Sequence, residues 1–597
     1  MNQENTSPEA TPGIPRPRRG MLWHAGAVIA FVCVSWFWAS LSRDKGVEHV
    51  KTSDTTSIYF QVVMQYRHER ATAKPGETDG WHWKELAQQV WKDQRTTFAS
   101  TDLGTLYQAS FTRYLGTVYR ATGDVTLGYK ILVFPLNLIF LLGAYALFFR
   151  LTGKHALATT LAVLASLPIA IPLAGEYFGM GPVTIYSRRT LFTAFAPFAI
   201  FLFYRWAHRP GLLLVAFAFL GLISNLHSSG ILLAEMLVMT YLLGSNCGGR
   251  AWLHALGYGA ATAIFGFVAM GGLWAQVSAF AKSLLQAVIP SALAAASGTA
   301  LRPEIPETMV YLFYPPHIYA QLPDTLVHVM TFLVATLPFG VIFMRRTMAA
   351  RLHAPALFVA VMATTAFLAY SELKYYLLVA AVLFILARKR PPDPAFELTH
   401  YFGLAIFYVS FVGMLLFQAG YYFVDGFPLV ANQLRGTRFL GFFVFVWLAV
   451  LASRITWHDV QPWGRRTLVA CATIAFLMAL RQDFRSYIRH KENPETAALM
   501  DVARWSKAHT PETAKFLVAS TAFAVIAERD VLLHDKDSRT TTGQETLDRM
   551  QSGFQTLNKL ATDTKMDYIV VGKNLSGLPA PVYENSLLAL IQPKSDK

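Results

Sequence analysis

The sequence contains little charge and little cysteine. Only 15% of its 597 residues are charged and 54% are hydrophobic, which exceeds the share of about 45–50% usual for soluble domains. This balance excludes an intrinsically disordered chain and disfavours a soluble globule. The three cysteines, Cys33, Cys247 and Cys471, have no spacing typical of a zinc site, a redox motif or a disulfide framework.

The chain also lacks the short motifs of several enzyme classes. It has no Walker loop, no G-x-G-x-x-G after a strand, no G-x-S-x-G elbow and no H-E-x-x-H pair. Asp535-Lys536-Asp537 has the D-x-D form of a metal-binding motif, but alone we interpret it as a surface turn. Acidic residues are scarce as well, with 37 against 52 basic ones and a net charge of +15.

Long apolar runs are what the sequence has in abundance. Runs of roughly 17–25 residues suit a transmembrane helix, and we count about thirteen. They predict a mainly α fold, a polytopic transmembrane helical bundle. We read the first run, after Arg18 and Arg19, as a retained signal anchor. The predicted spans are 21–41, 127–149, 156–173, 190–206, 212–225, 230–243, 252–276, 325–344, 354–370, 374–387, 400–420, 438–453 and 467–480. The short spans 212–225 and 230–243 are alternatively half-helices that break inside the bilayer.

Basic residues alternate between loops in a way that predicts the orientation. Arg150, Arg205, Arg250 and Arg454 lie in loops on the same side as the basic N-terminus, which the positive-inside rule makes cytoplasmic. This placement also accounts for the positive charge without a nucleic-acid partner. The predicted regions are a cytoplasmic tail (1–20), a first helix (21–41), a first extracytoplasmic loop (42–128), a helical domain (129–480) with an outer loop (277–324), and an extracytoplasmic domain (481–597).

The C-terminal region has the composition of a small soluble α/β domain. Residues 494–508 and 542–561 predict helices, whereas 515–519 and 567–571 read as buried strands. A last strand is expected within residues 586–592.

This architecture resembles that of the C-type (GT-C) glycosyltransferases, membrane enzymes that use polyprenyl-phosphate-linked sugars. The shared features are a single first helix, a long first outer loop, about a dozen further helices and an outer C-terminal domain. Several strings also resemble uncharacterised bacterial GT-C-like membrane proteins. They are Tyr177-Phe178-Gly179, Ser187-Arg188-Arg189-Thr190, the segment 225–230, Asn432-Gln433-Leu434-Arg435, the segment 505–517 and Glu528-Arg529-Asp530.

The resemblance implies that an acid in the first outer loop acts as the catalytic base on the acceptor. A hydroxyl or amide that attacks the sugar carbon must lose its proton, and a carboxylate at the membrane surface accepts it. The loop offers Asp44, Glu48 and Asp54. We favour Asp54 because it opens an aromatic stretch that reads as helical, although each of these acids is also compatible with a solvated surface role.

Candidate substrate-binding residues lie on the outer side of the membrane, where the positive-inside rule predicts few basic residues. Departure of a lipid phosphate develops negative charge, which cations in the outer half of the bilayer would stabilise. Arg188, Arg189 and Arg435 are placed there, with Gln433 beside Arg435, and Arg438 lies nearby. Each arginine is equally compatible with interfacial snorkelling.

One histidine, His227, and three acidic residues outside the first loop complete the set of candidate site residues. His227 occupies a polar break between two apolar runs and suits either ligand contact or a simple turn. No metal site is predicted from Glu176, Glu372 or Asp425, and a divalent cation stays open as a cofactor.

We therefore expect a multi-pass protein of the plasma (inner) membrane that contacts the lipid bilayer. It would transfer a sugar from a polyprenyl phosphate to an unidentified acceptor on the outer face. A transporter or flippase for a lipid-linked or anionic substrate is the alternative, as is a non-catalytic GT-C-like protein.

Overall fold

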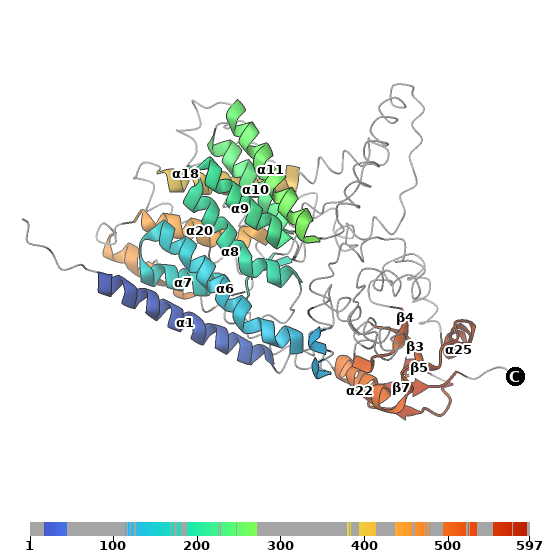
Figure 1. The fold of residues 1–597 in the computed structure, drawn as a ribbon. Coiled ribbons are helices and arrows are strands. Elements are labelled where there is room, and N and C mark those ends of the chain that lie inside the picture. Colours follow the sequence, from blue (N-terminus) through green and yellow to red (C-terminus); the bar gives the residue numbers. More distant parts are fainter. Residues whose placement is uncertain are drawn as a thin grey trace, which may run out of the picture.

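The computed structural model describes two parts of the chain, a helical bundle and a C-terminal sheet domain (Figure 1). The main described segments are 17–43, 127–167, 169–171, 176–180, 188–224, 229–245, 248–270, 393–412, 438–455, 460–467, 494–520, 526–533, 553–575 and 577–593, with isolated shorter pieces between them. The chain is mainly helical, as predicted.

The helices of the bundle follow the predicted apolar runs closely. They are α1 (Pro17–Arg43), α6 (Leu127–Thr152), α7 (His155–Ser166), α8 (Arg188–Trp206), α9 (Pro210–Ser224), α10 (Ser229–Gly244), α11 (Gly249–Met270), α18 (Pro394–Phe407) and α20 (Phe439–Ser453). A π-helical turn, η2 (Tyr408–Val412), follows α18 directly. The predicted spans 325–344 and 354–370 and the outer loop 277–324 lie outside the described residues.

The predicted span 156–173 is wrong at its C-terminal end. Helix α7 ends at Ser166, and Leu167 has extended backbone angles (φ −66°, ψ 134°). Pro168 explains the stop, because a proline disfavours the helical conformation of the residue before it. The chain then forms a short antiparallel hairpin of β1 (Ile169–Ile171) and β2 (Glu176–Phe178), in which Ile171 pairs with Glu176.

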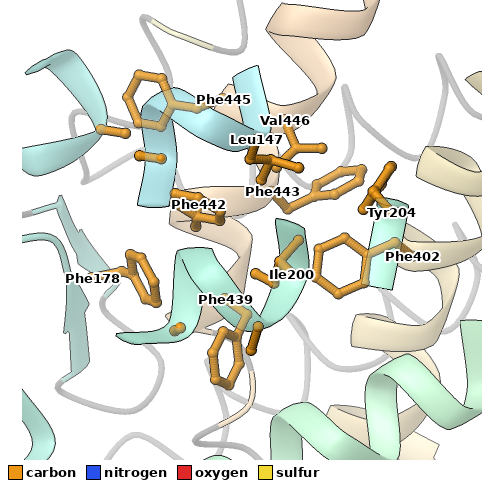
Figure 2. Close-up of a cluster of buried hydrophobic side chains, with 14 of the residues drawn as sticks. Leu147, Phe178, Ile200, Tyr204, Phe402, Phe439, Phe442, Phe443, Phe445 and Val446 are labelled. Atoms are coloured by element: carbon orange, nitrogen blue, oxygen red, sulfur yellow. The ribbon is translucent and has the colours of Figure 1, made fainter. Parts of the chain in front are cut away.

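Helix α20 lies at the centre of the bundle. Every residue from Phe439 to Leu451 is buried, and a helix that is apolar all round is one enclosed by other elements. Phe442 and Phe443 contact aromatic rings from three different elements (Figure 2). These rings are Phe140 and Phe148 of α6, Phe178 of β2 and Phe402 of α18.

Helices α9 and α10 fold back on one another as an antiparallel pair. Tyr258 of α11 shows this, because its ring stacks on Phe217 of α9 at 4.7 Å and contacts Tyr241 near the end of α10 at 5.1 Å. Its hydroxyl also donates to the carbonyl of Pro210, at the start of α9. The start of α9 and the end of α10 thus lie together, so the two are not consecutive halves of one broken helix.

Two of the described helical stretches, Gly20–Ser40 and Lys130–Thr152, are long and apolar enough to cross a membrane. Several other apolar helices of the described part are shorter, such as α9 with 15 residues and α10 with 16. At 1.5 Å per residue each of these is about 23 Å long, against about 30 Å for a hydrocarbon core.

The C-terminal domain is a mixed five-stranded sheet with the order β4-β3-β5-β7-β6. Strand β3 (Lys515–Ala519) is parallel to β4 (Asp530–Leu533) and β5 (Tyr568–Gly572). Strand β7 (Leu588–Ile591) is antiparallel to β5 and β6 (Tyr583–Glu584). The α/β prediction and its three strands are confirmed; β4 and β6 were not predicted.

Helices α22 (Pro494–His509) and α25 (Phe554–Asp563) cover opposite faces of this sheet. Phe516 packs with Val502 of α22, whereas its neighbour Leu517 packs with Leu557 of α25. Consecutive residues of a strand point to opposite faces, so β3 is buried on both sides. This explains why residues 515–519 read as a continuous apolar run.

Arg529 fastens the end of α22. Its buried guanidinium donates to the carbonyl of Lys507, in the last turn of the helix, and to that of Thr510, which follows the helix. It also donates to the carbonyls of Ala527 and Glu528. Capping of terminal carbonyls by an arginine is favourable because those groups lack partners within the helix. Arg529 therefore has a structural role.

A second contact ties the sheet to α22. The Tyr583 hydroxyl donates to Asp501 at 2.7 Å, and the Asn585 amide donates to the same carboxylate oxygen at 3.2 Å. The hydrogen bond to Asp501, with smaller effects of burial and of the carboxylate charge, raises the pKa of Tyr583.

Figure 1 shows the C-terminal domain beyond the end of the bundle at which α1 ends and α6 begins. Val531 of β4 packs against both the bundle core and the core of the sheet domain. Within the described residues, Val531 thus connects the domain to this end of the bundle.

Candidate functional site

Helices α8 and α20 begin at the same end of the bundle. Phe192, in the second turn of α8, contacts Phe439 at the start of α20 with ring centroids 6.2 Å apart. At their other ends both helices reach the first turns of α18, because Tyr204 hydrogen-bonds to Thr399 and Arg454 pairs with Asp393. The two helices are therefore parallel, and their N-termini lie side by side.

Arg438, the residue before α20, is fully buried at this point. Its Cζ lies 5.7 Å from the Phe192 ring centroid and 5.3 Å from that of Phe439. Cation–π contacts of this kind are worth about 0.5–2 kcal/mol, much less than the cost of removing a guanidinium from water. The two rings are not the only contacts of Arg438 within the protein.

Arg438 also lies at the unfavourable end of its helix. Unsatisfied amide groups give a helix N-terminus a partial positive charge, which repels cations and attracts anions. Arg188 and Arg189 are the first two residues of α8, so they have the same disfavoured position. Three arginines at two adjacent helix N-termini form an arrangement suited to an anion.

The structure thus places the backbone of Arg188 and Arg189 at the same end of the bundle as Arg438, which lies far from them in the sequence. Arg188 precedes Phe192 by four residues, which is about one helical turn, and Phe192 touches Arg438. The backbone places Arg188 and Arg189 here, while Gln433 and Arg435 fall outside the described residues. We call the starts of α8 and α20 with Arg188, Arg189 and Arg438 the arginine end of the bundle.

A buried serine lies beside this arginine end. Ser410 belongs to η2 and is fully buried. It lies against Gly436, where an added Cβ would be 2.5 Å from Ser410 Oγ and 2.5 Å from Met236 Cε. A side chain at position 436 would therefore displace these neighbours. Sequence reasoning missed Ser410, because nothing in its apolar surroundings distinguishes it.

The predicted acids and His227 are not placed by the structure. Asp44, Glu48, Asp54, His227, Glu372 and Asp425 all lie outside the described residues, as does the D-x-D string. Glu176 is described, but as a strand residue of β2 rather than part of an open loop.

One acid of the bundle was missed altogether. Glu235 lies in the apolar helix α10, is half-buried and directly precedes Met236, the neighbour of Gly436. An ionisable residue inside a long apolar run is itself a signal for function, and the sequence would have revealed it by that criterion.

Metal ligands do not gather in the part of the chain that is described. No group of three or more His, Cys, Asp or Glu side chains there is arranged to hold an ion. The arginine end itself is positively charged, which favours anions over cations.

Specific side-chain pairs join helix ends at the opposite end of the bundle. Arg454 Nη1 donates to Asp393 Oδ2 at 2.9 Å, and its Cζ lies 4.3 Å from the Phe396 ring centroid. Nearby helix ends are joined by Tyr145, whose hydroxyl lies 2.8 Å from both His24 Nδ1 of α1 and His155 Nδ1 of α7. Protein groups thus satisfy one another at this end.

Comparison with known proteins adds no assignment, since no family model and no curated protein sequence matches the chain.

Proposed function

We propose that the chain is a multi-pass protein of the plasma membrane, with the arginine end and the C-terminal domain outside. Large apolar side chains on the bundle surface support this placement. Leu253 and Leu256 of α11 are 68% and 69% exposed, and Trp36 of α1 is 65% exposed, which is unfavourable in water and favourable in lipid. Arg150 and Arg205 end their helices at the opposite side, as the positive-inside rule requires of a cytoplasmic face.

We further propose a glycosyltransferase of GT-C type that uses a polyprenyl-phosphate sugar donor. The observation that carries this proposal is the convergence of Arg188, Arg189 and Arg438 at two helix N-termini. A lipid phosphate suits this location because its tail occupies the bilayer and its charge meets the arginines. Arg435 and Gln433, a few residues before Arg438 in the chain, extend the same binding role.

In the proposed reaction an acceptor oxygen or nitrogen attacks the anomeric carbon of the sugar. The new glycosidic bond forms as the bond between that carbon and the phosphate oxygen breaks, and the polyprenyl phosphate leaves with the electron pair. Asp54 takes the acceptor proton, with Asp44 and Glu48 as the other candidate bases. The arginines stabilise the charge that develops on the phosphate, and His227 contacts donor or acceptor.

The experiment is a sugar-transfer assay on the purified full chain in lipid nanodiscs with radiolabelled polyprenyl-phosphate sugars. The expected result is transfer that Asp54→Asn and Arg438→Gln each abolish. Full transfer by Asp54→Asn would remove the base assignment. Absence of transfer with every donor, together with movement of the lipid between leaflets, would instead identify a flippase.

A flippase would use the same arginines for binding but needs a pathway to the cytoplasmic side. The Arg454–Asp393 pair and the Tyr145 cluster occupy that side. Their presence favours the transferase over the flippase.

A further inference from the structure

Ser410, like Ser35 of α1, differs from most other buried hydroxyl groups of the bundle. Ser166, Ser224 and Thr240 each donate to a carbonyl three or four residues earlier in their own helices. Ser410 Oγ is equally buried, yet it has no hydrogen-bond partner within the described chain. Buried polar groups are satisfied in the great majority of cases, so an unsatisfied hydroxyl indicates an absent partner.

The location of this hydroxyl indicates what the partner is. Gly436, against which Ser410 packs, precedes Arg438 by only two residues. Ser410 also lies in a π-helical turn, a rare form that often occurs at functional sites.

We propose that Ser410 is a positioning residue whose hydroxyl donates to an oxygen of the phosphate bound at the arginine end. This inference rests on the proposed function, since it assigns a further contact to the same phosphate. A phosphate has several acceptor oxygens, so it can bind a guanidinium and a hydroxyl together. Gly436 is required because a side chain there would meet Ser410 Oγ.

A ligand role and a structural role predict effects of opposite sign for Ser410→Ala. If the hydroxyl serves only the ligand, its removal relieves an unsatisfied buried group and the ligand-free protein keeps or raises its Tm. Binding of phosphate then weakens by about 10-fold or more, as expected for a lost hydrogen bond to a charged group. A structural hydroxyl would give a lower Tm and unchanged binding.

The experiment measures Tm and binding for the full chain in nanodiscs, with undecaprenyl phosphate, inorganic phosphate and the uncharged undecaprenol as separate probes. Weaker binding of either phosphate probe to Ser410→Ala, with undecaprenol unaffected, supports the proposal. If Ser410→Ala binds both phosphate probes more weakly, the phosphate group alone is sufficient for recognition. If it binds only undecaprenyl phosphate more weakly, the site recognises a lipid headgroup.

Ser166→Ala is the matched control, because Ser166 is also fully buried but donates to Val163 at 2.7 Å. It should lower Tm and leave phosphate binding unchanged. Wild-type affinity in Ser410→Ala, combined with loss of binding in Arg438→Gln, overturns the Ser410 assignment and leaves the proposed function intact. Failure of the wild-type protein to bind any phosphate probe overturns both.

Discussion

Helix α20 carries one buried arginine at each end, and the two have opposite relations to their helix. Arg454 follows the C-terminus, where the helix dipole favours a cation, and it pairs with Asp393 and stacks on Phe396. Arg438 precedes the N-terminus, where the dipole disfavours a cation, and it faces aromatic rings. These contacts give Arg454 a structural role, whereas the role that we propose for Arg438 is to bind a phosphate.

The largest effect that distinguishes the two ends is expected from Arg438→Gln. Removal of one electrostatic contact to a leaving phosphate should lower the rate of sugar transfer by about 100-fold or more. Transfer rates and thermal unfolding of the same nanodisc preparation would check this, and an unchanged rate would refute the role of Arg438.

The reverse pattern is expected for Arg454→Gln. Loss of the hydrogen-bonded pair with Asp393 should destabilise the protein by about 1.5–3 kcal/mol, while the transfer rate per folded molecule stays near that of the wild type. Arg454→Lys is the control, since it keeps a charge for Asp393 but loses the planar stack on Phe396. If Arg454→Gln lost transfer activity but kept its stability, the two ends of α20 would not differ in function as proposed.

A smaller effect is expected at the Tyr145 cluster, which lies at the same end of the bundle as Arg454. Tyr145→Phe removes the hydrogen bonds with His24 and His155 and should destabilise the protein by about 1–2 kcal/mol. Tyr241→Phe, which removes hydrogen bonds to His254 and Tyr258 but does not affect α1, is the comparison. An unchanged Tm in Tyr145→Phe would show that the cluster does not fasten α1 to its neighbours.

The smallest effect is expected in the C-terminal domain, at the Tyr583–Asp501 contact. Since the folded protein raises the pKa of Tyr583, this contact stabilises the domain fully below the ordinary value of about 10 and is lost as pH rises through the raised pKa. Asp501→Asn should return that pKa toward its ordinary value. Ultraviolet titration of tyrosinate, with Tyr583→Phe as the reference, would measure the shift, and transfer activity should not change.

The sequence predicted the positions of the helices better than the way in which they pack together. Apolar runs located α6, α8 and α20 within a few residues, because a long apolar segment fixes a helix by itself. The α7 boundary failed because Pro168 was not weighed against the surrounding apolar run.

The candidate site could be predicted only in part. Arg188, Arg189 and Arg438 were recognised as cations on the side that should carry few. Their convergence depends on how α8 and α20 pack, which no local pattern contains. Ser410 and its approach to Gly436 arise from the π-helical turn and the packing around it, and so they could not be read from residue type.

The most direct test of the central claim compares the two ends of α20 in one binding experiment. Native mass spectrometry would count undecaprenyl phosphate bound to the wild type, Arg438→Gln and Arg454→Gln in nanodiscs of a neutral lipid. We predict that the wild type and Arg454→Gln bind the phosphate and that Arg438→Gln loses it. Equal binding by both variants would contradict the assignment of the arginine end as the phosphate site.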